Sequence, residues 1–510
     1  NSGSINIDST QFIQNIASSM TDLEFNQSNL TELSKVEGNY GALYIESADI
    51  FSSLTISGCI FDQNEARVQN GAIFIDTEST TPPKITISNT VLKNNIAKSD
   101  YGGMLIQNYG ELTIDKCSFI NNTASSTLLK EDNLIKGICG ALFIDDVSVL
   151  LTLNILNCVF QSNKACGDFG ALLIKSTNSS INIRNMSIIM NECEGDFAGF
   201  SLNCKGEVSL DKCNVINNTA CKKNSPSFTP TDALIIEGTA NYLIKDSNFS
   251  KSSRLENNTN IQVSIIAPND YAINVAFESC MFSIINPTSS QIYIQNKNNL
   301  GKISFVLSSF SCFYTSTSNN FTAGGLVRFF DENDISEDNG YYHIYVSSEC
   351  VGTISITKSC FDTNEQLLVY RSAGSSDYYY PNDQIPFALS ENLSLYFQSN
   401  QLEGKCPYPE VINDLAQNIG DIQLRITPTI PPNNKKSNKK LHIIIGTSIG
   451  GVCLIAIIIV TAILLKKKRD IAYLKNNRNY EDKSEEICQE TVDAINMKYD
   501  KVWNNFSTQT

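Results

Sequence analysis

The residues best suited to catalysis in this chain of 510 residues are few. Hydrolysis of a glycosidic bond needs two carboxyl groups at a set separation, one of them protonated. Asp145 and Asp146 form the only adjacent pair of aspartates in the repeated region, and His343 is the only histidine before residue 441. No metal-ligand spacing, phosphate-binding loop or nucleophile motif accompanies them. We therefore expect no enzyme activity, no cofactor and no bound metal.

The 16 cysteines could form disulfides, but their spacing favours a different use for several of them. Cys59, Cys117 and Cys158 each begin a Cys-x-Phe string, and Cys213 begins the equivalent Cys-x-Val; in each, both side chains point to the same face of a strand. A buried free thiol that fills space is the preferred interpretation there. Cysteines near the turns of successive repeats are better disulfide candidates, with the pairing left open; they are Cys139, Cys166, Cys193, Cys204 and Cys221.

Asparagines in Asn-x-Ser/Thr triplets are potential acceptors for N-linked glycans on secreted chains. Ten such triplets precede residue 441, with acceptors at Asn26, Asn29, Asn121, Asn178, Asn185, Asn217, Asn248, Asn257, Asn320 and Asn392. Together with the cysteine content, they favour an oxidising, extracellular location for this part of the chain. The first residue is Asn1, and we expect a mature form or a fragment from which a signal peptide is missing.

Three short strings recur along the chain and must position any functional residue. The first has the form Cys-x-Phe-x-x-Asn-x-Ala and recurs, with substitutions at the Cys, Phe and Ala positions, at residues 10–17, 59–66, 90–97, 117–124, 158–165, 186–193 and 213–220. The second, of the Gly-Ala-Leu-x-Ile type, occurs at residues 41–45, 71–75, 102–106, 140–144, 170–174 and 198–202. The third alternates apolar and polar residues at 54–57, 85–88, 112–115, 153–156, 181–184 and 208–211.

The spacing of the first string predicts the fold. Its asparagines follow one another at 49, 31, 27, 41, 28 and 27 residues, which indicates a period of 27–31 residues with two insertions. All three strings alternate with a period of two, and no helical period lies between them. We therefore expect an all-β domain, a right-handed parallel β-helix over residues 1–425 with three strands per turn. The repeat is clear to about residue 245 and has weaker echoes at 246–250, 279–283 and 359–364.

The conserved composition of the strings predicts how successive turns contact one another. Small Gly-Ala pairs should let neighbouring turns approach closely. The asparagine of each turn should stack on its equivalents and hydrogen-bond along the coil, which satisfies backbone groups at the corner. These residues are expected to hold the coil together, so they carry no separate chemistry.

A single membrane-spanning α-helix is predicted at residues 441–465, where the only ionisable side chain is His442. Residues 426–440 form a stalk, and residues 466–510 form a cytoplasmic tail that begins with a basic cluster. The N-terminus is expected outside, most simply at the cell surface, with the lipid bilayer as a partner. Gly446 and Gly450 form a Gly-x-x-x-Gly spacing that allows helix packing, so self-association is possible.

A net charge of −15 argues against nucleic-acid binding.

The interleaved strings resemble the repeats of the chlamydial polymorphic outer-membrane proteins, which also occur in large transmembrane β-helix proteins of ciliates. The resemblance rests on Phe-x-x-Asn at residues 12–15, 61–64, 119–122 and 160–163 and on the Gly-Ala strings, and it covers residues 1–245. It implies a β-helix of the pectin-lyase-like type and a role in surface adhesion. The bacterial proteins are secreted through a β-barrel, whereas this chain has a predicted membrane helix instead, so that secretion mechanism is not implied.

Three functions follow as hypotheses. The first is a cell-surface glycoprotein with a structural, adhesive or recognition role, which binds surface glycans or proteins along the coil. The second is a membrane-tethered carbohydrate-active enzyme, because parallel β-helices also carry lyases and hydrolases. The third is a receptor that signals through its tail. The lack of a catalytic pattern favours the first.

Overall fold

The computed structural model describes residues 3–17, 40–46, 51–77, 83–107, 109–125, 137–146, 151–195, 197–220, 231–252, 261–267, 272–285, 291–296, 301–313, 323–330, 341–347, 350–362, 369–371, 387–390 and 393–398. All of them belong to one compact unit, Asn1–Glu410. The predicted stalk, membrane helix and tail at residues 426–510 lie outside the described residues, as do Gly446 and Gly450. Among the described residues, no helix is long and apolar enough to cross a membrane.

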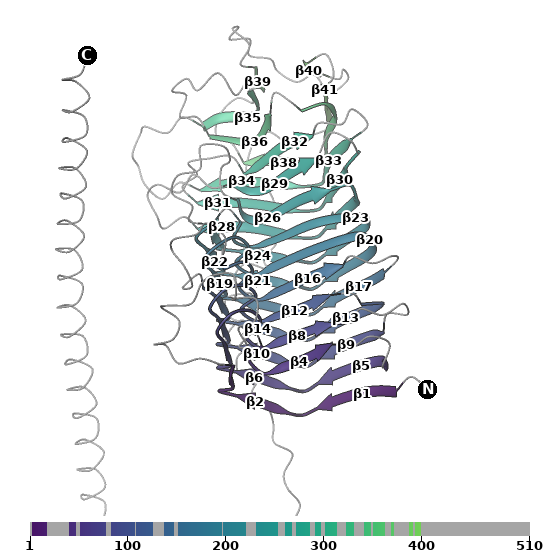
Figure 1. Ribbon diagram of the computed structural model, residues 1–510. Coiled ribbons are helices and arrows are strands. Elements are labelled where there is room, and N and C mark those ends of the chain that lie inside the picture. Colours follow the sequence, from purple (N-terminus) through teal and green to yellow (C-terminus); the bar gives the residue numbers. More distant parts are fainter. Residues whose placement is uncertain are drawn as a thin grey trace, which may run out of the picture. The chain divides into compact units, whose positions relative to one another are not determined.

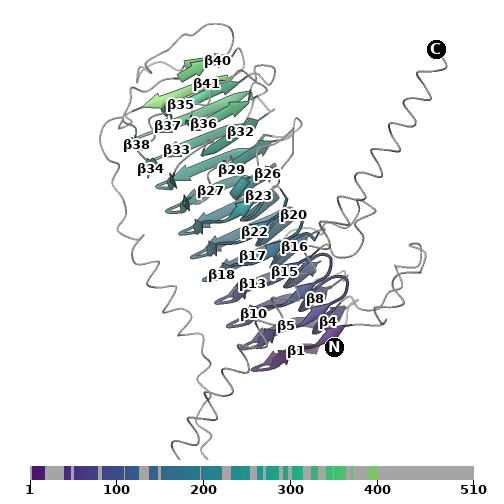
Figure 2. The same cartoon turned by 90° about the vertical axis from the view of Figure 1, so that its left-hand side faces the viewer.

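The described chain is an all-β solenoid, in which the strands of each turn pair in parallel with those of the next (Figure 1). One sheet has 23 strands, a second has 11 and a third has seven; we name them sheets A, B and C. Successive turns lie one above another from β1 (Gly3–Asp8) to β41 (Leu393–Gln398) (Figure 2). The prediction of an all-β parallel β-helix is confirmed.

Sheets B and C hold the first string of each turn. Sheet B consists of β2 (Gln11–Ile13), β6 (Ile60–Asp62), β10 (Val91–Lys93), β14 (Ser118–Ile120), β18 (Val159–Gln161), β21 (Ser187–Ile189), β24 (Asn214–Ile216), β28 (Asn248–Ser252), β31 (Met281–Ile285), β34 (Ser309–Phe313) and β38 (Cys360–Asp362). Sheet C consists of β3 (Ile16–Ala17), β7 (Glu65–Ala66), β11 (Ile96–Ala97), β15 (Thr123–Ala124), β19 (Lys164–Ala165), β22 (Glu192–Cys193) and β25 (Thr219–Ala220).

Sheet A contains two series of strands. The first series holds the Gly-Ala strings and consists of β4 (Leu43–Glu46), β8 (Ile73–Asp76), β12 (Met104–Gln107), β16 (Leu142–Asp146), β26 (Thr231–Gly238), β29 (Ile261–Ala267), β32 (Ile292–Asn296), β36 (Tyr341–Ser347), β35 (Ala323–Phe330) and β39 (Val369–Arg371). The second series consists of β1, β5 (Phe51–Ser57), β9 (Lys84–Ser88), β13 (Glu111–Asp115), β17 (Leu151–Leu156), β27 (Asn241–Lys245), β30 (Asn274–Glu278), β33 (Lys302–Val306), β37 (Gly352–Thr357) and β41.

The two series join where a single long strand serves both, in β20 (Leu172–Arg184) and β23 (Phe200–Asp211). At the far end β40 (Phe387–Ser390) pairs antiparallel with β41, whereas the other pairings found in the described chain are parallel. The prediction of three strands per turn was incomplete. Seven successive turns also hold a two-residue strand of sheet C, which is too short to show alternation in the sequence.

The core is filled by the inward side of every strand. In sheet B the central inward residue is aromatic in most turns, and the rings stack from turn to turn. The ring centroids of Phe119 and Phe160 lie 4.7 Å apart, and those of Phe310 and Phe361 lie 4.6 Å apart. The echoes predicted after residue 245 are thus real turns of the same coil, since Phe249 and Phe282 continue the stack at 5.3 Å.

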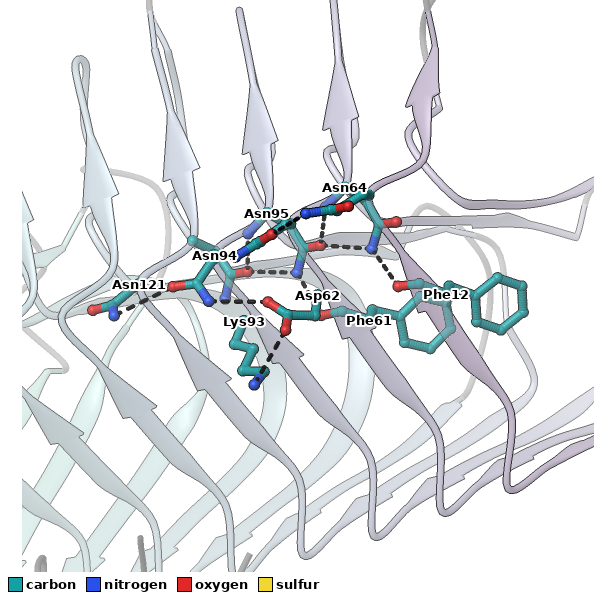
Figure 3. Close-up of polar contacts among 11 residues, drawn as sticks. Phe12, Phe61, Asp62, Asn64, Lys93, Asn94, Asn95 and Asn121 are labelled. Atoms are coloured by element: carbon teal, nitrogen blue, oxygen red, sulfur yellow. Dashed lines mark hydrogen bonds and ion pairs between the residues drawn. The ribbon is translucent and has the colours of Figure 1, made fainter. Parts of the chain in front are cut away.

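The asparagine of the first string forms the predicted ladder. Asn64 Nδ2 donates to Asn95 Oδ1 at 2.8 Å and to the carbonyl of Phe12 at 3.0 Å, and Asn95 Oδ1 also accepts from Asn64 N (Figure 3). The same pattern repeats through Asn122, Asn163, Asn191 and Asn218. Each interior amide uses both hydrogens and both acceptor sites of its oxygen, which is the full capacity of the group.

The ladder ends where the repeat weakens, and the structure supplies the reason. In the turn after Asn218, the corner holds the buried ion pair of Lys251 with Asp232. Asp232 also accepts a hydrogen bond from Ala220 N at 2.8 Å. In later turns the buried amides of Gln262 and Gln291 donate to backbone carbonyls instead. A different set of polar groups therefore satisfies the corner, and the asparagine is no longer needed.

A second corner, between sheet A and sheet B, explains the cysteine positions. At this corner one residue has positive φ and is followed by a cysteine, a threonine or a serine. The thiol or hydroxyl of that following residue donates a hydrogen bond to the backbone carbonyl of the residue two positions before it. Thiols and hydroxyls do this alike; the pairs are Thr10 to Asp8 (3.0 Å), Cys59 to Ser57 (3.3 Å), Thr90 to Ser88 (2.9 Å), Cys117 to Asp115 (3.4 Å), Cys158 to Leu156 (3.2 Å) and Ser247 to Lys245 (2.7 Å). The free-thiol interpretation is confirmed, and the thiol is a hydrogen-bond donor as well as a filler.

This role predicts the outcome of two nearly isosteric substitutions. Cys158→Thr keeps a donor at the corner, whereas Cys158→Val removes it and leaves the Leu156 carbonyl without this bond. We expect the valine variant to be less stable than the threonine variant by about 1 kcal/mol, the net value of a typical intramolecular hydrogen bond. Urea denaturation of the two variants measures the difference. Equal stability would show that the thiol only fills space.

Candidate recognition surface

The first series of sheet A carries apolar side chains on its outer face as well as on its core face. Tyr44, Phe74, Leu105, Phe143 and Leu173 occupy one outward position in five successive turns, in direct register. Phe74, Leu105, Phe143 and Leu173 are buried in a cluster separate from the main core. Tyr44, on the first strand of the series, is 42% exposed.

Side chains from the corner between sheet C and this series pack on the same row. They are Tyr40, Tyr101, Ile138 and Phe169. The ring of Tyr40 stacks on that of Tyr44 at 4.1 Å, and the ring of Tyr101 stacks on that of Phe143 at 5.2 Å. We call the row and these corner residues the outer aromatic cluster.

The backbone at the corner beside the cluster is left-handed in several turns. Tyr101 and Phe169 both have a φ of 65° and Cys139 has a φ of 61°, in the region that bulky side chains rarely adopt. Such strain costs on the order of 1–3 kcal/mol and persists only when surrounding contacts impose it. Asn70 precedes the glycine of its own turn in the same way and has a φ of 62°, so the left-handed backbone belongs to this corner, where Tyr101 and Phe169 provide aromatic rings to the cluster.

A polar row lies beside the cluster, two residues further along each strand. Glu46, Asp76, Gln107, Asp145 and Lys175 align in successive turns. The Lys175 ammonium lies 5.4 Å from the centroid of the Phe143 ring, a cation–π contact. The surface thus combines aromatic rings with carboxylate and amide groups at one edge.

The tyrosines of the cluster stay protonated at any physiological pH. A hydrogen bond from its hydroxyl to Glu46 raises the pKa of Tyr44 above its ordinary value of 10.0. Burial raises the pKa of Tyr40 and of Tyr101. The cluster therefore presents neutral rings and hydroxyl donors, which suit stacking and hydrogen bonding rather than acid–base chemistry.

The residues predicted to be the best catalytic candidates do not form a constellation here. Asp145 lies in β16 and is aligned with Gln107 and Lys175 of the neighbouring turns. Asp146 ends β16 and His343 lies in β36, and their side chains are outside the described part. Among the described residues, no group of three or more His, Cys, Asp or Glu side chains could hold a metal ion.

The cysteines predicted as disulfide candidates are placed by the coil instead. Cys139 and Cys166 are free thiols, and no disulfide joins Cys139, Cys166, Cys193 and Cys204 to one another. Cys139 is buried in the outer aromatic cluster, Cys193 packs with alanines of sheet C, and Cys204 lies in the main core. Cys166 is half-buried, and its thiol lies 3.7 Å from Glu194 Oε1 in the neighbouring turn. Cys221 lies outside the described residues.

The buried thiols should make the free energy of unfolding depend on pH in the alkaline range. Burial raises the pKa of Cys139, Cys213 and Cys280 to about 12, above the ordinary value of 9.0. Unfolded chains ionise these thiols first, so the free energy of unfolding should be unaffected below pH 9.0 and fall as the pH rises toward about 12. Urea denaturation across this range measures the slope. The control is a Cys213→Thr/Cys280→Thr double variant, which should have a shallower slope; an unchanged slope would contradict the assignment.

The predicted glycan acceptors fall into distinct places in the turn. Asn121 and Asn185 are exposed at corners, Asn217 is half-buried at a corner, and Asn248 is buried in β28. Asn178 lies in β20, and its side chain is not described. The other acceptors, Asn26, Asn29, Asn257, Asn320 and Asn392, lie outside the described residues.

The outer aromatic cluster was missed by the sequence analysis, although a signal for it exists. In the Gly-Ala strings three consecutive apolar residues break the two-fold alternation, as at Ile73, Phe74 and Ile75. Aromatic residues also precede the glycines at Tyr40, Tyr101 and other positions. A strand with apolar residues on both faces indicates an outer face that is covered or used in binding.

No family model, no curated protein and no solved structure matches the sequence or the fold.

Proposed function

We propose that this chain is a cell-surface glycoprotein in which a right-handed β-helix, carried on a single membrane helix at residues 441–465, has a structural, adhesive or recognition role. The right-handed sense follows from the strong preference of parallel strand connections for that hand. The apolar run and its basic flank support the membrane anchor. Cys360 is disulfide-bonded, which supports an oxidising compartment.

One observation carries the recognition role. The ladder asparagines and the corner thiols are engaged in contacts inside the coil, while the outer aromatic cluster lies on its outer face, apart from the main core. Adhesive surfaces are enriched in tyrosine because a rigid ring provides contact area and its hydroxyl provides a hydrogen bond. The exposed Tyr44 ring beside Glu46 has this character.

The experiment displays the full chain on cells and measures binding to other cells and to a glycan array. We expect Tyr40→Ser/Tyr44→Ser to reduce binding about tenfold or more, which corresponds to roughly 1.4 kcal/mol of lost contact energy. Tyr396→Ser is the control, because Tyr396 is similarly exposed, at 45%, but lies on β41 in the second series. Equal binding by the two variants would place recognition elsewhere.

The same displayed protein separates the competing functions. Release of reducing sugars that is lost in Asp145→Asn would establish the carbohydrate-active enzyme in place of a recognition protein. Deletion of residues 470–510 is expected to leave surface level and adhesion unchanged. Loss of the cellular response to binding in that deletion would favour the receptor.

A further inference from the structure

The potential glycan acceptors differ in solvent exposure according to their place in the turn. Asn121 occupies the corner between sheets B and C, with a φ of 53°, and Asn185 occupies the corner between sheets A and B, with a φ of 51°. Both side chains are exposed. Asn248 lies inside strand β28 and is only 9% exposed. We propose that Asn121 and Asn185 carry N-linked glycans and that Asn248 does not.

The amide geometry at both corners is compatible with a glycan. Asn121 Nδ2 donates one hydrogen to Asn94 Oδ1 at 3.5 Å, and Asn185 Nδ2 donates one to Asn157 Oδ1 at 3.0 Å (Figure 3 shows the first). Formation of the N-glycosidic bond replaces one of the two amide hydrogens and leaves the other. The corner bond can therefore persist, while the sugar extends into solvent.

The ladder asparagine next to Asn121 is not itself an acceptor, because Ala124 stands where its triplet would need Ser or Thr. This residue, Asn122, is fully buried and uses both amide hydrogens, toward Leu92 O and Asn163 Oδ1, each at 3.0 Å. The adjacent Asn121 points the opposite way, because its left-handed backbone turns the side chain outward. Two neighbouring asparagines thus have separate uses, one inside the coil and one outside.

Asn248 has none of these properties. It pairs in register with Asn214 on one side and Met281 on the other, in the middle of sheet B. Its Oδ1 is buried without a hydrogen-bond partner. Because Asn248 is only 9% exposed, a branched sugar at its nitrogen would need the surrounding contacts to open.

The two modified corners both border sheet B, one at each edge of it. Asn185 follows the C-terminal half of β20, which pairs with the second series, whereas Leu173 of the outer aromatic cluster lies in its N-terminal half. Sheet C lies between Asn121 and the corner residues of that cluster. Glycans at Asn121 and Asn185 would therefore cover the sheet B side of the coil and leave the proposed recognition surface accessible.

This inference rests on the proposed function, because N-linked glycans are added in the lumen of the secretory pathway, to the part of the chain that later faces outside the cell. The test expresses the full chain in eukaryotic cells and maps the occupied asparagines by mass spectrometry after peptide N-glycosidase treatment. We expect modification of Asn121 and Asn185 and none of Asn248. A further triplet, at Asn505 in the tail, should also stay unmodified and reports the orientation of the chain.

Each matched variant introduces a residue that the coil already has at the equivalent position of another turn. Gln14 and Gln63 stand at the position of Asn121, and Lys116 and Lys212 stand at that of Asn185, all with positive φ. Ser187 stands at the position of Asn248, two turns earlier in sheet B. Asn121→Gln and Asn185→Lys should each remove the mass of one glycan, and Asn248→Ser should remove none.

The outcomes separate the two proposals. Occupied Asn248, or bare Asn121 and Asn185 in a chain modified at other acceptors such as Asn26, would overturn this inference and leave the cell-surface role intact. Modification of Asn505 with none before residue 441 would overturn the proposed orientation. A chain that carries no glycan at all would count against both.

Discussion

Replacement of Asn163 by alanine is expected to lower the free energy of unfolding by about 3–5 kcal/mol. The wild-type side chain donates to Phe119 O at 3.0 Å and to Asn191 Oδ1 at 2.9 Å. It also accepts from Asn122 N and Nδ2, both at 3.0 Å. Alanine leaves these buried groups without their partners, and each such group costs about 1–3 kcal/mol.

Asn182→Ala is the control for this prediction. Asn182 lies on the outer face of β20, half-buried, and donates to Asn154 Oδ1 at 3.3 Å in the neighbouring turn. Water can replace that bond, so we expect a loss below about 1 kcal/mol. Urea denaturation followed by circular dichroism compares the two variants. Losses of the same size would mean that the ladder is no more important than any other row of polar contacts.

Replacement of Gly170 by alanine is expected to cost about 3 kcal/mol or more. A Cβ at this position would lie 2.5 Å from the carbonyl oxygen of Ala198 and 2.6 Å from that of Glu192. Both atoms belong to the backbone of the next turn, so no side-chain rotation can relieve the contact. The same close approach occurs at Gly71, Gly102 and Gly140, so the Gly-Ala strings provide the expected close contact of turns.

The expected loss of stability is opposite in sign to the usual effect of a Gly→Ala change. Gly170 does not have positive φ, and a Gly→Ala change at such a position usually stabilises a protein by about 0.4–1 kcal/mol. Gly3→Ala is the control, because a Cβ there would have no heavy atom within 4 Å. Thermal and urea unfolding of both variants give the comparison. A Gly170→Ala protein as stable as the wild type would mean that the turns are further apart than the structure has them.

The outward rows of the second series are used for contacts between turns and are therefore poor candidates for binding. Ion pairs join Lys84 to Glu111 at 2.7 Å and Lys245 to Glu278 at 2.8 Å, across neighbouring strands. Exposed pairs of this kind are screened by water and contribute little to stability. They set the register of the coil more than its stability, and the aromatic cluster remains the distinctive outer surface.

The sequence by itself determined the coil and the residues that hold it. A period of 27–31 residues places Phe12, Phe61 and Phe119 in equivalent environments, so local alternation and the repeat together identify the inward face of each strand. The asparagine ladder could be predicted for the same reason. An asparagine at the same corner of each turn lies next to the equivalent asparagines of the turns above and below.

What depends on contacts between turns was decided only by the tertiary structure. The two-residue strands of sheet C carry no alternation, and the donor role of Cys158 depends on the backbone of its corner. The end of the ladder at Asn218 depends on Asp232 and Lys251, which are 19 residues apart and meet only when the coil closes. The outer aromatic cluster likewise requires Tyr101 and Phe143 to be neighbours across a turn. A local pattern shows which side of a strand is apolar, but only the stacked turns show what covers it.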